Sequence, residues 1–227
     1  MIRYILTLVV VLIIAVYLAR QARKPDKWMG RPFLWLMNLF HAALTDWGLQ
    51  QVSIGKNFKI LDIGCGGGRT VQKLAAVATE GHVCGVDYAN GSVAVSRSKN
   101  AGLIKSGRVV IREGSVSQLP FPDCSFDLAV AVETQYYWPD LVNDMKEVRR
   151  VLKSGGRLIV IAETYKHGRF DKLKAPAMKL LTSSNLSADD QRQLFLSAGY
   201  DHVQVIEEKK KGWICAMGTK AQTNGLQ

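Results

Sequence analysis

The residues best suited to chemistry lie in and just after a glycine-rich stretch. The run ILDIGCGGGRT, residues 60–70, places Gly64, Gly66 and Gly68 directly behind a short apolar segment. The backbone there can turn tightly and approach a ligand without Cβ atoms in the way. Asp87 ends the next apolar run, where its carboxylate can accept hydrogen bonds from both hydroxyls of a ribose. This arrangement predicts a site for a nucleoside-containing cofactor.

The glycine spacing bears on which cofactor is bound. Dinucleotide sites usually have the pattern GxGxxG, but its third glycine would fall on Arg69. The chain instead has GxGxG from Gly64 to Gly68, with Asp62 two residues before it. This spacing weakens the nicotinamide interpretation.

The same segment resembles the first motif of class I S-adenosylmethionine (SAM) dependent methyltransferases. Later segments resemble that family in the expected order: VDYA with Asp87, then residues 113–134, then residues 147–163. The similarity is good over roughly residues 57–163. It is greatest to the small-molecule branch that includes the quinone-biosynthesis methyltransferases.

The resemblance implies SAM as the cofactor and gives each contact a role. Asp87 would bind the ribose, although an aspartate here could instead cap a helix. Asp62 would act on the methionine ammonium, directly or through water, or only brace the turn. Tyr88 would flank the adenine, and the backbone at Gly64 and Gly66 would contact the methionine portion. The complete expected cofactor site is Asp62, Gly64, Cys65, Gly66, Gly68, Asp87, Tyr88, Ser115, Val116 and Glu133.

One position departs from the family pattern. Where the family usually has an aspartate for the adenine amino group, this chain has Ser115. A hydroxyl can accept that hydrogen bond without a charge, and Val116 still offers its backbone amide. The prediction is weaker or water-assisted adenine binding, with the site retained.

Methyl transfer depends mainly on positioning, and it needs a base only where the accepting atom must lose a proton. Candidate catalytic residues follow the fourth expected strand, at Glu133, Tyr136 and Tyr137; the two tyrosines, with Trp138, would form a substrate wall or simply pack under a loop. His167 follows the fifth strand and could act as a general base. The remaining histidines, expected to be structural or exposed, are His41, His82 and His202.

Alternating strands and helices predict an α/β fold with a doubly wound, seven-stranded, mostly parallel sheet that ends in an antiparallel hairpin. Strands are expected at 58–63, 82–87, 108–113, 126–132, 156–162, 202–207 and 212–218. Helices are expected at 31–51, 68–78, 90–101, 140–152 and 187–198. The domain would span 57–220, with a frayed tail at 221–227.

The N-terminus carries an uncharged apolar run over residues 4–19, slightly short of the ~20 residues that span a bilayer. Residues 1–24 are therefore predicted to be a transmembrane or membrane-anchor helix. A cleaved signal peptide and a buried core helix are the alternatives, disfavoured by the bulky Tyr17 near any cleavage site and by an apolar surface on every face. Five basic residues at 20–31 against Arg3 place the following chain in the cytoplasm. Residues 25–56 read as an amphipathic, aromatic-rich helical segment that would lie along the membrane or cover the pocket.

Composition narrows the functional classes. A chain of 227 residues suits one α/β domain with a short extension. Its four cysteines have no metal-ligand spacing, so neither a zinc site nor a disulfide framework is expected. The net charge of +11 would attract anionic lipid, and the absence of a nucleic-acid-binding motif argues against nucleic acid as the partner.

These features predict a membrane-anchored methyltransferase that acts on a small, lipophilic acceptor at the cytoplasmic face of the membrane. No obligate protein partner is inferred. Two alternatives remain open: methylation of a protein or nucleic acid, and a membrane protein that binds SAM without catalysis.

Overall fold

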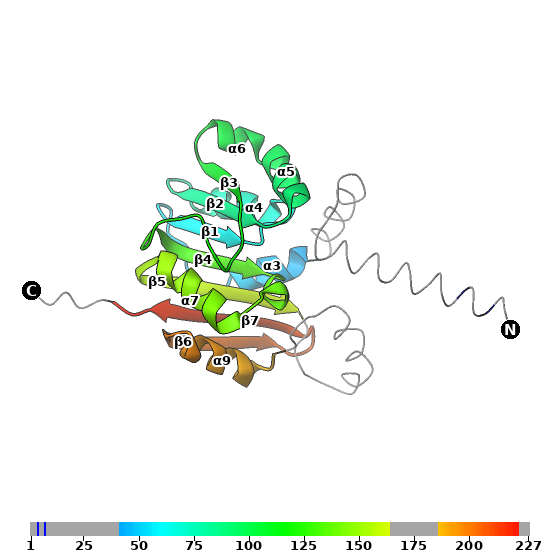
Figure 1. The fold of residues 1–227 in the computed structure, drawn as a ribbon, viewed down its shortest axis with the longest axis vertical. Coiled ribbons are helices and arrows are strands. Elements are labelled where there is room, and N and C mark those ends of the chain that lie inside the picture. The colour runs from blue at the N-terminus through cyan, green and yellow to red at the C-terminus, as the bar shows by residue number, and fades with distance from the viewer. Residues whose placement is uncertain (1–3, 5–6, 8–40, 164–185, 223–227) are drawn as a thin grey trace, which may run out of the picture.

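A computed structural model describes residues 4, 7, 41–163 and 186–222. Its centre is a seven-stranded sheet with the strand order β3-β2-β1-β4-β5-β7-β6 (Figure 1). The strands are β1 (Lys59–Ile63), β2 (His82–Asp87), β3 (Val109–Glu113), β4 (Phe126–Val132), β5 (Leu152–Glu163), β6 (Tyr200–Glu208) and β7 (Trp213–Lys220).

The strand directions confirm the predicted fold class. Strands β3, β2, β1, β4 and β5 pair in parallel, whereas β7 pairs antiparallel with both β5 and β6. The chain order reverses between β1 and β4, since β1 leads outward to β2 and β3 while β4 leads to β5. In open α/β sheets a crevice forms at such a point, outside the carboxyl ends of the strands.

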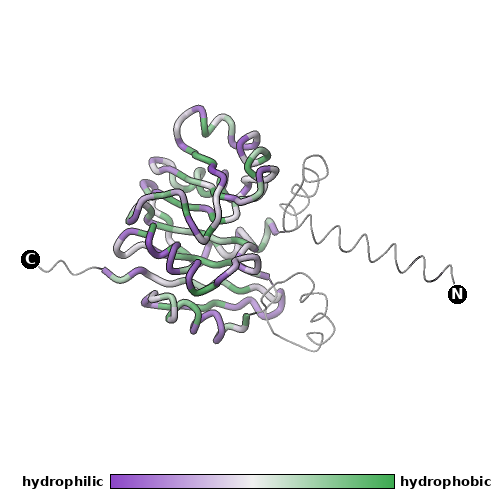
Figure 2. Tube along the Cα trace, viewed as in Figure 1, coloured by the Kyte–Doolittle hydropathy of each residue, from purple (hydrophilic) through white to green (hydrophobic). Residues whose placement is uncertain are grey.

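Helices cover both faces of the sheet. Apolar side chains of α3, α4 and α5 pack on one face, and those of α7 and α9 pack on the other. Along the flanking helices, hydrophobic and hydrophilic stretches alternate, as amphipathic helices require (Figure 2). The helices are α3 (Ala42–Leu49), α4 (Arg69–Val77), α5 (Asn90–Lys99), α6 (Ala101–Lys105), η1 (Gln135–Tyr137), α7 (Leu141–Val151) and α9 (Ala188–Ser197).

Two predicted boundaries were wrong, each for a local reason. The single helix expected at 90–101 breaks at Asn100, whose buried amide donates hydrogen bonds to the Gly68 and Ser96 carbonyls at 3.0 and 2.9 Å. The expected strand 156–162 begins earlier, at Leu152. It follows α7 directly; its register against β4 is irregular between Leu152 and Arg157, and Gly155 in this stretch has a φ of 74°.

Helix α3 packs on β5 and β7 next to the sheet. Gly48 permits the close approach, because a Cβ atom at this position would overlap the Ile161 side chain at about 2.5 Å. The rings of Trp47 and Trp213 also meet, with centroids 5.8 Å apart. Only the part of the predicted helix 31–51 from residue 41 onward lies within the described residues.

The described residues contain no helix that is both long and apolar enough to cross a membrane. The predicted anchor, apart from Tyr4 and Thr7, lies outside these residues, as does His167.

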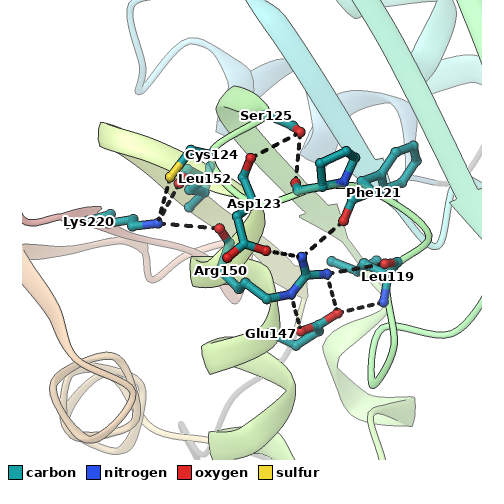
Figure 3. A network of polar contacts seen from close by, with 10 residues as sticks. Leu119, Phe121, Asp123, Cys124, Ser125, Glu147, Arg150, Leu152 and Lys220 are labelled. Atoms are coloured by element: carbon teal, nitrogen blue, oxygen red, sulfur yellow. Dashed lines mark hydrogen bonds and ion pairs between the residues drawn. The ribbon is translucent and has the colours of Figure 1, made fainter.

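Arg150 on α7 fixes the loop between β3 and β4 (Figure 3). Its guanidinium bonds to Glu147 through two nitrogens at 2.8 and 2.7 Å, and to Asp123 at 2.6 Å. It also donates hydrogen bonds to the carbonyls of Phe121 and Leu119 at 3.0 and 3.2 Å. Several nitrogen donors of this guanidinium therefore hold the β3–β4 loop against α7.

Candidate functional site

A cavity of about 400 Å³ opens at the carboxyl ends of β1, β2 and β4. This is the place at which the reversal of strand order predicts a ligand. Eight of the ten predicted cofactor-site residues line it; these are Gly64, Cys65, Gly66, Asp87, Tyr88, Ser115, Val116 and Glu133.

The glycine turn needs the conformations that glycine provides. Gly64, Gly66 and Gly68 have φ values of 71°, 47° and 75°, in the left-handed region. The amide of Gly64 donates to the Val86 carbonyl at 2.8 Å, which fastens the turn to β2. A Cβ atom at Gly64 would overlap the methyl group of Thr134. The turn is therefore tightly packed, and glycines form much of its lining of the cavity.

Asp87 supports the turn and faces the cavity. One carboxylate oxygen accepts from the Gly66 amide at 2.9 Å, and the other accepts from the Ala89 amide at 2.9 Å. Burial raises the pKa of Asp87, while these two amides and Ser92 lower it. The two amides and Ser92 leave part of the carboxylate's acceptor capacity unused, so Asp87 can brace the turn and still accept from a ribose.

Asp62 lies in β1 and does not line the cavity, as Gly68 also does not. Its side chain is buried, and its Oδ2 atom has no hydrogen-bond partner. Burial, and then the charge of Asp87, raise the pKa of Asp62 to about 8. A buried carboxylate oxygen without a partner fits a cationic group such as the methionine ammonium of SAM, reached through water or a small shift.

The residues predicted to contact adenine are Tyr88, Ser115 and Val116, and all three line the cavity. Val116 is buried, and Tyr88 is 42% exposed and lines the cavity. The Ser115 hydroxyl accepts a hydrogen bond from the Ser117 amide at 3.2 Å, so it stabilises a local turn as well as facing the cavity. Its role toward adenine stays a prediction.

The other end of the cavity is formed by the segment after β4. Of the three residues predicted as a substrate wall, Tyr137 and Trp138 line it, and so does the catalytic candidate Glu133. Tyr136 instead points its hydroxyl at the Glu133 carboxylate and the Glu163 carbonyl, at 3.0 and 2.6 Å. It packs beside the cavity rather than within its wall.

Sequence reasoning missed His41. It was expected to be structural or exposed, but its ring lines the cavity and its Nε2 lies 3.7 Å from Glu133 Oε2. No local pattern marks this histidine, because it stands just before α3 and reaches the site only through the packing of that helix on β5. The packing of this helix over the sheet is the one signal that could have suggested that His41 reaches the site.

Comparisons with known proteins agree with this geometry. Residues 61–160 match the family described as a methyltransferase domain. An O-methyltransferase, cnsE, of Penicillium expansum is 30% identical over 149 residues, which is 65% of this chain and 54% of that protein. A demethylmenaquinone methyltransferase of Symbiobacterium thermophilum is 34% identical over 112 residues, 49% of this chain and 45% of its own length. The chain spans about half the length of the curated relatives it matches.

Solved structures show the same fold. A SAM-dependent methyltransferase from Aquifex aeolicus superposes with a TM-score of 0.63 at 18% identity, covering 78% of this chain and 89% of that one. At this identity the likeness establishes the fold alone. The matched segment 61–160 contains the glycine turn, Asp87 and the β4 segment. Residues 61–160 are therefore similar to a methyltransferase domain over the segment that carries this site, and SAM is the cofactor that the similarity supports.

Proposed function

We propose that this protein transfers a methyl group from SAM to a small, lipophilic acceptor at the cytoplasmic face of a membrane. The observation that carries the proposal is the single cavity running from Asp87, after β2, to Glu133, after β4. Because β1 lies between these strands, the two ends of the cavity are about 10 Å apart. One end suits a nucleoside, and the other end remains for an acceptor.

The acceptor end supports a lipophilic substrate. Its described lining includes Val132, Tyr137, Trp138 and Pro139. Apolar and aromatic walls favour apolar ligands, and the polar groups at this end, among them His41 and Glu133, would orient the acceptor. The relatives include a demethylmenaquinone methyltransferase, whose named substrate is a lipophilic quinone. A small cavity of this kind also favours a small molecule over a protein or nucleic acid.

The chain's own residues would act by positioning. SAM supplies an electrophilic methyl group when bound. The glycine turn and Asp87 would orient it, and the aromatic residues after β4 would exclude water and align the acceptor.

The first experiment is a calorimetric titration of the full chain in detergent with SAM, S-adenosylhomocysteine and NAD. The proposal requires binding of the first two and none of NAD. Incubation with SAM and a demethylmenaquinol, followed by mass spectrometry, then tests turnover. A protein that holds SAM without ever consuming it would match the non-catalytic alternative.

The membrane location is a separate part of the proposal, based on the uncharged run at residues 4–19. The variant Val11→Arg/Ile14→Arg would place two charges in that run, each costing about 2.5–3.5 kcal/mol at a helix centre. Sedimentation with liposomes should fall for this variant and not for the matched Val11→Leu/Ile14→Leu. Equal liposome binding and equal activity toward the quinol in both variants would refute the anchor.

A further inference from the structure

A partly buried polar cluster lies at the acceptor end of the cavity and includes Glu133, which the sequence also placed among the expected cofactor contacts. Glu133 stands at its centre, directly after β4. Its Oε1 atom accepts hydrogen bonds from the Glu163 amide and, at 3.0 Å, from the Tyr136 hydroxyl. Its Oε2 atom faces His41 Nε2 at 3.7 Å. The carboxyl is thus held firmly through one oxygen and presents the other to a histidine.

The backbone at Glu133 is held in an uncommon conformation. Its φ of 56° lies in the left-handed region, which costs a non-glycine residue about 1 kcal/mol or more. The conformation persists because the Glu133 amide donates to the Ile161 carbonyl at 2.9 Å while the side chain bonds to the next residues of β5. Such strain is concentrated at functional sites. Here its effect is to direct a carboxyl into the cavity wall.

The charges around the cluster favour proton exchange near neutral pH. Burial raises the pKa of Glu133 to about 7, opposed by its bonds to the Glu163 amide and to Tyr136 and reinforced by the Glu163 charge. Burial lowers the pKa of His41, and the Glu163 carboxylate opposes that shift. Glu163 is itself fixed by the Trp213 indole at 2.9 Å. Neither member of the pair is therefore locked in its charged form.

The geometry points to His41 as a general base, positioned by Glu133, that removes the proton from an acidic hydroxyl of the acceptor, a phenol or an enol. This inference rests on the proposed function and deepens it by naming the substrate class. The acceptor oxygen bonds to the methyl carbon, whose bond to sulfur breaks with both electrons remaining on sulfur. The hydroxyl proton goes to the His41 ring nitrogen that does not face Glu133, and the Glu133 carboxylate balances the resulting imidazolium through Nε2.

The choice of hydroxyl follows from matching proton affinities. A neutral imidazole removes protons most efficiently from groups whose acidity is near its own, and phenols and enols come far closer to it than alkyl alcohols do. The gap of 3.7 Å between His41 and Glu133 exceeds a hydrogen bond, and such distances commonly shorten when substrate binds. The adjacent aromatic residues Tyr137 and Trp138 offer flat surfaces for the ring of a phenol.

The test uses 4-nitrophenol, whose phenol and phenolate forms absorb at different wavelengths. The full chain in detergent is saturated with S-adenosylhomocysteine and titrated with the probe one pH unit below the probe's own pKa. The phenolate band should grow on binding in the wild-type chain. It should be at least tenfold weaker in His41→Gln, clearly weaker in Glu133→Gln and unchanged in the matched control His82→Gln, whose histidine is exposed.

Calorimetry of S-adenosylhomocysteine on the same samples separates the two levels of the argument. Absence of that binding in the wild-type chain would overturn the proposed function. Normal cofactor-product binding with no phenolate band, or a band that persists in His41→Gln, would overturn only the base.

A second measurement does not depend on a variant that folds. The His41 imidazole is followed by nitrogen-resolved NMR in the wild-type chain while 4-nitrophenol is added. The inference requires both ring nitrogens of His41 to be protonated in the complex. An imidazole that stays neutral while the probe binds would overturn it.

Discussion

Replacement of Asp87 separates cofactor binding from support of the fold. Its two carboxylate oxygens each accept one backbone amide, from Gly66 and from Ala89. The predicted ribose contacts would use the remaining lone pairs. Asp87→Asn keeps the shape and one acceptor oxygen, whereas Asp87→Ala removes both, so the two variants divide the effects.

The magnitudes follow from those bonds. Loss of a hydrogen bond to a charged group costs about 1.5–3 kcal/mol, so SAM affinity should fall about 10- to 150-fold in Asp87→Ala. The same variant leaves the buried Ala89 amide without an acceptor, which should lower the free energy of unfolding by about 1–3 kcal/mol. Asp87→Asn should lose less stability, because its amide oxygen still accepts one of the two bonds, while its SAM affinity still falls.

Calorimetry with SAM and urea unfolding of the ligand-free protein measure the two quantities. Asp127→Asn is the matched control, since Asp127 also accepts from a backbone amide, that of Lys59 at 2.8 Å, at the start of β4 and away from the cavity. SAM affinity equal to wild type in both Asp87 variants would refute the assignment of the ribose site. A matching loss in the Asp127 control would show that any weakening of the sheet, rather than the ribose contact, lowers affinity.

Three further substitutions test the surroundings of the site. The pKa of Asp62 rises from 3.8 to about 8 on folding, so its contribution to stability is complete below pH 3.8 and is lost as pH rises through 8. The free energy of unfolding should therefore fall with pH, by at most about 1.4 kcal/mol per pH unit. Asp62→Asn should flatten this decline in unfolding measured from pH 4 to 8. Gly64→Ala combines a left-handed φ with overlap on Thr134 and should lower unfolding free energy by about 2–4 kcal/mol; wild-type stability would contradict the tight turn. Arg150→Met should lower the free energy of unfolding by about 2 kcal/mol, because it frees the β3–β4 loop. Lys146→Met, on the exposed side of α7, should change it little. Equal melting curves for the two variants would contradict a stabilising role of the Arg150 hydrogen bonds.

The parts of the fold that could be predicted from the sequence are those that depend on residues close together along the chain. The glycine turn is contiguous, and Asp87 follows it by one βα unit, so their meeting depends only on parallel pairing of β1 with β2. The direction of Asp62 is different, because β1 is covered on both faces and its burial pattern does not alternate. Sequence periodicity therefore could not show that this carboxylate lies behind the turn instead of in the cavity.

The different positions of Tyr136 and Tyr137 show a second limit of prediction from the sequence. Both lie in η1, a single turn of 3₁₀-helix in which neighbouring side chains diverge by about a third of a rotation. Tyr137 lines the cavity, and Tyr136 turns to the Glu163 carbonyl. Which of two adjacent tyrosines meets the ligand depends on where the turn begins, and the sequence does not fix that to within one residue.

Asp87 and Glu133 are two carboxylates at the same edge of the sheet, and their hydrogen-bond partners suit them to different roles. Asp87 has an amide on each oxygen, so both oxygens are oriented as acceptors and the group is suited to hold hydroxyls without giving or taking a proton. Glu133 has its backbone amide and phenol partners on one oxygen alone, and its other oxygen faces a histidine. A carboxyl with a pKa of about 7 and one oxygen without an amide donor can change its protonation state when a proton is transferred nearby. In the proposed mechanism, the separation of cofactor binding from proton transfer follows from where the amide donors lie, on either side of β1.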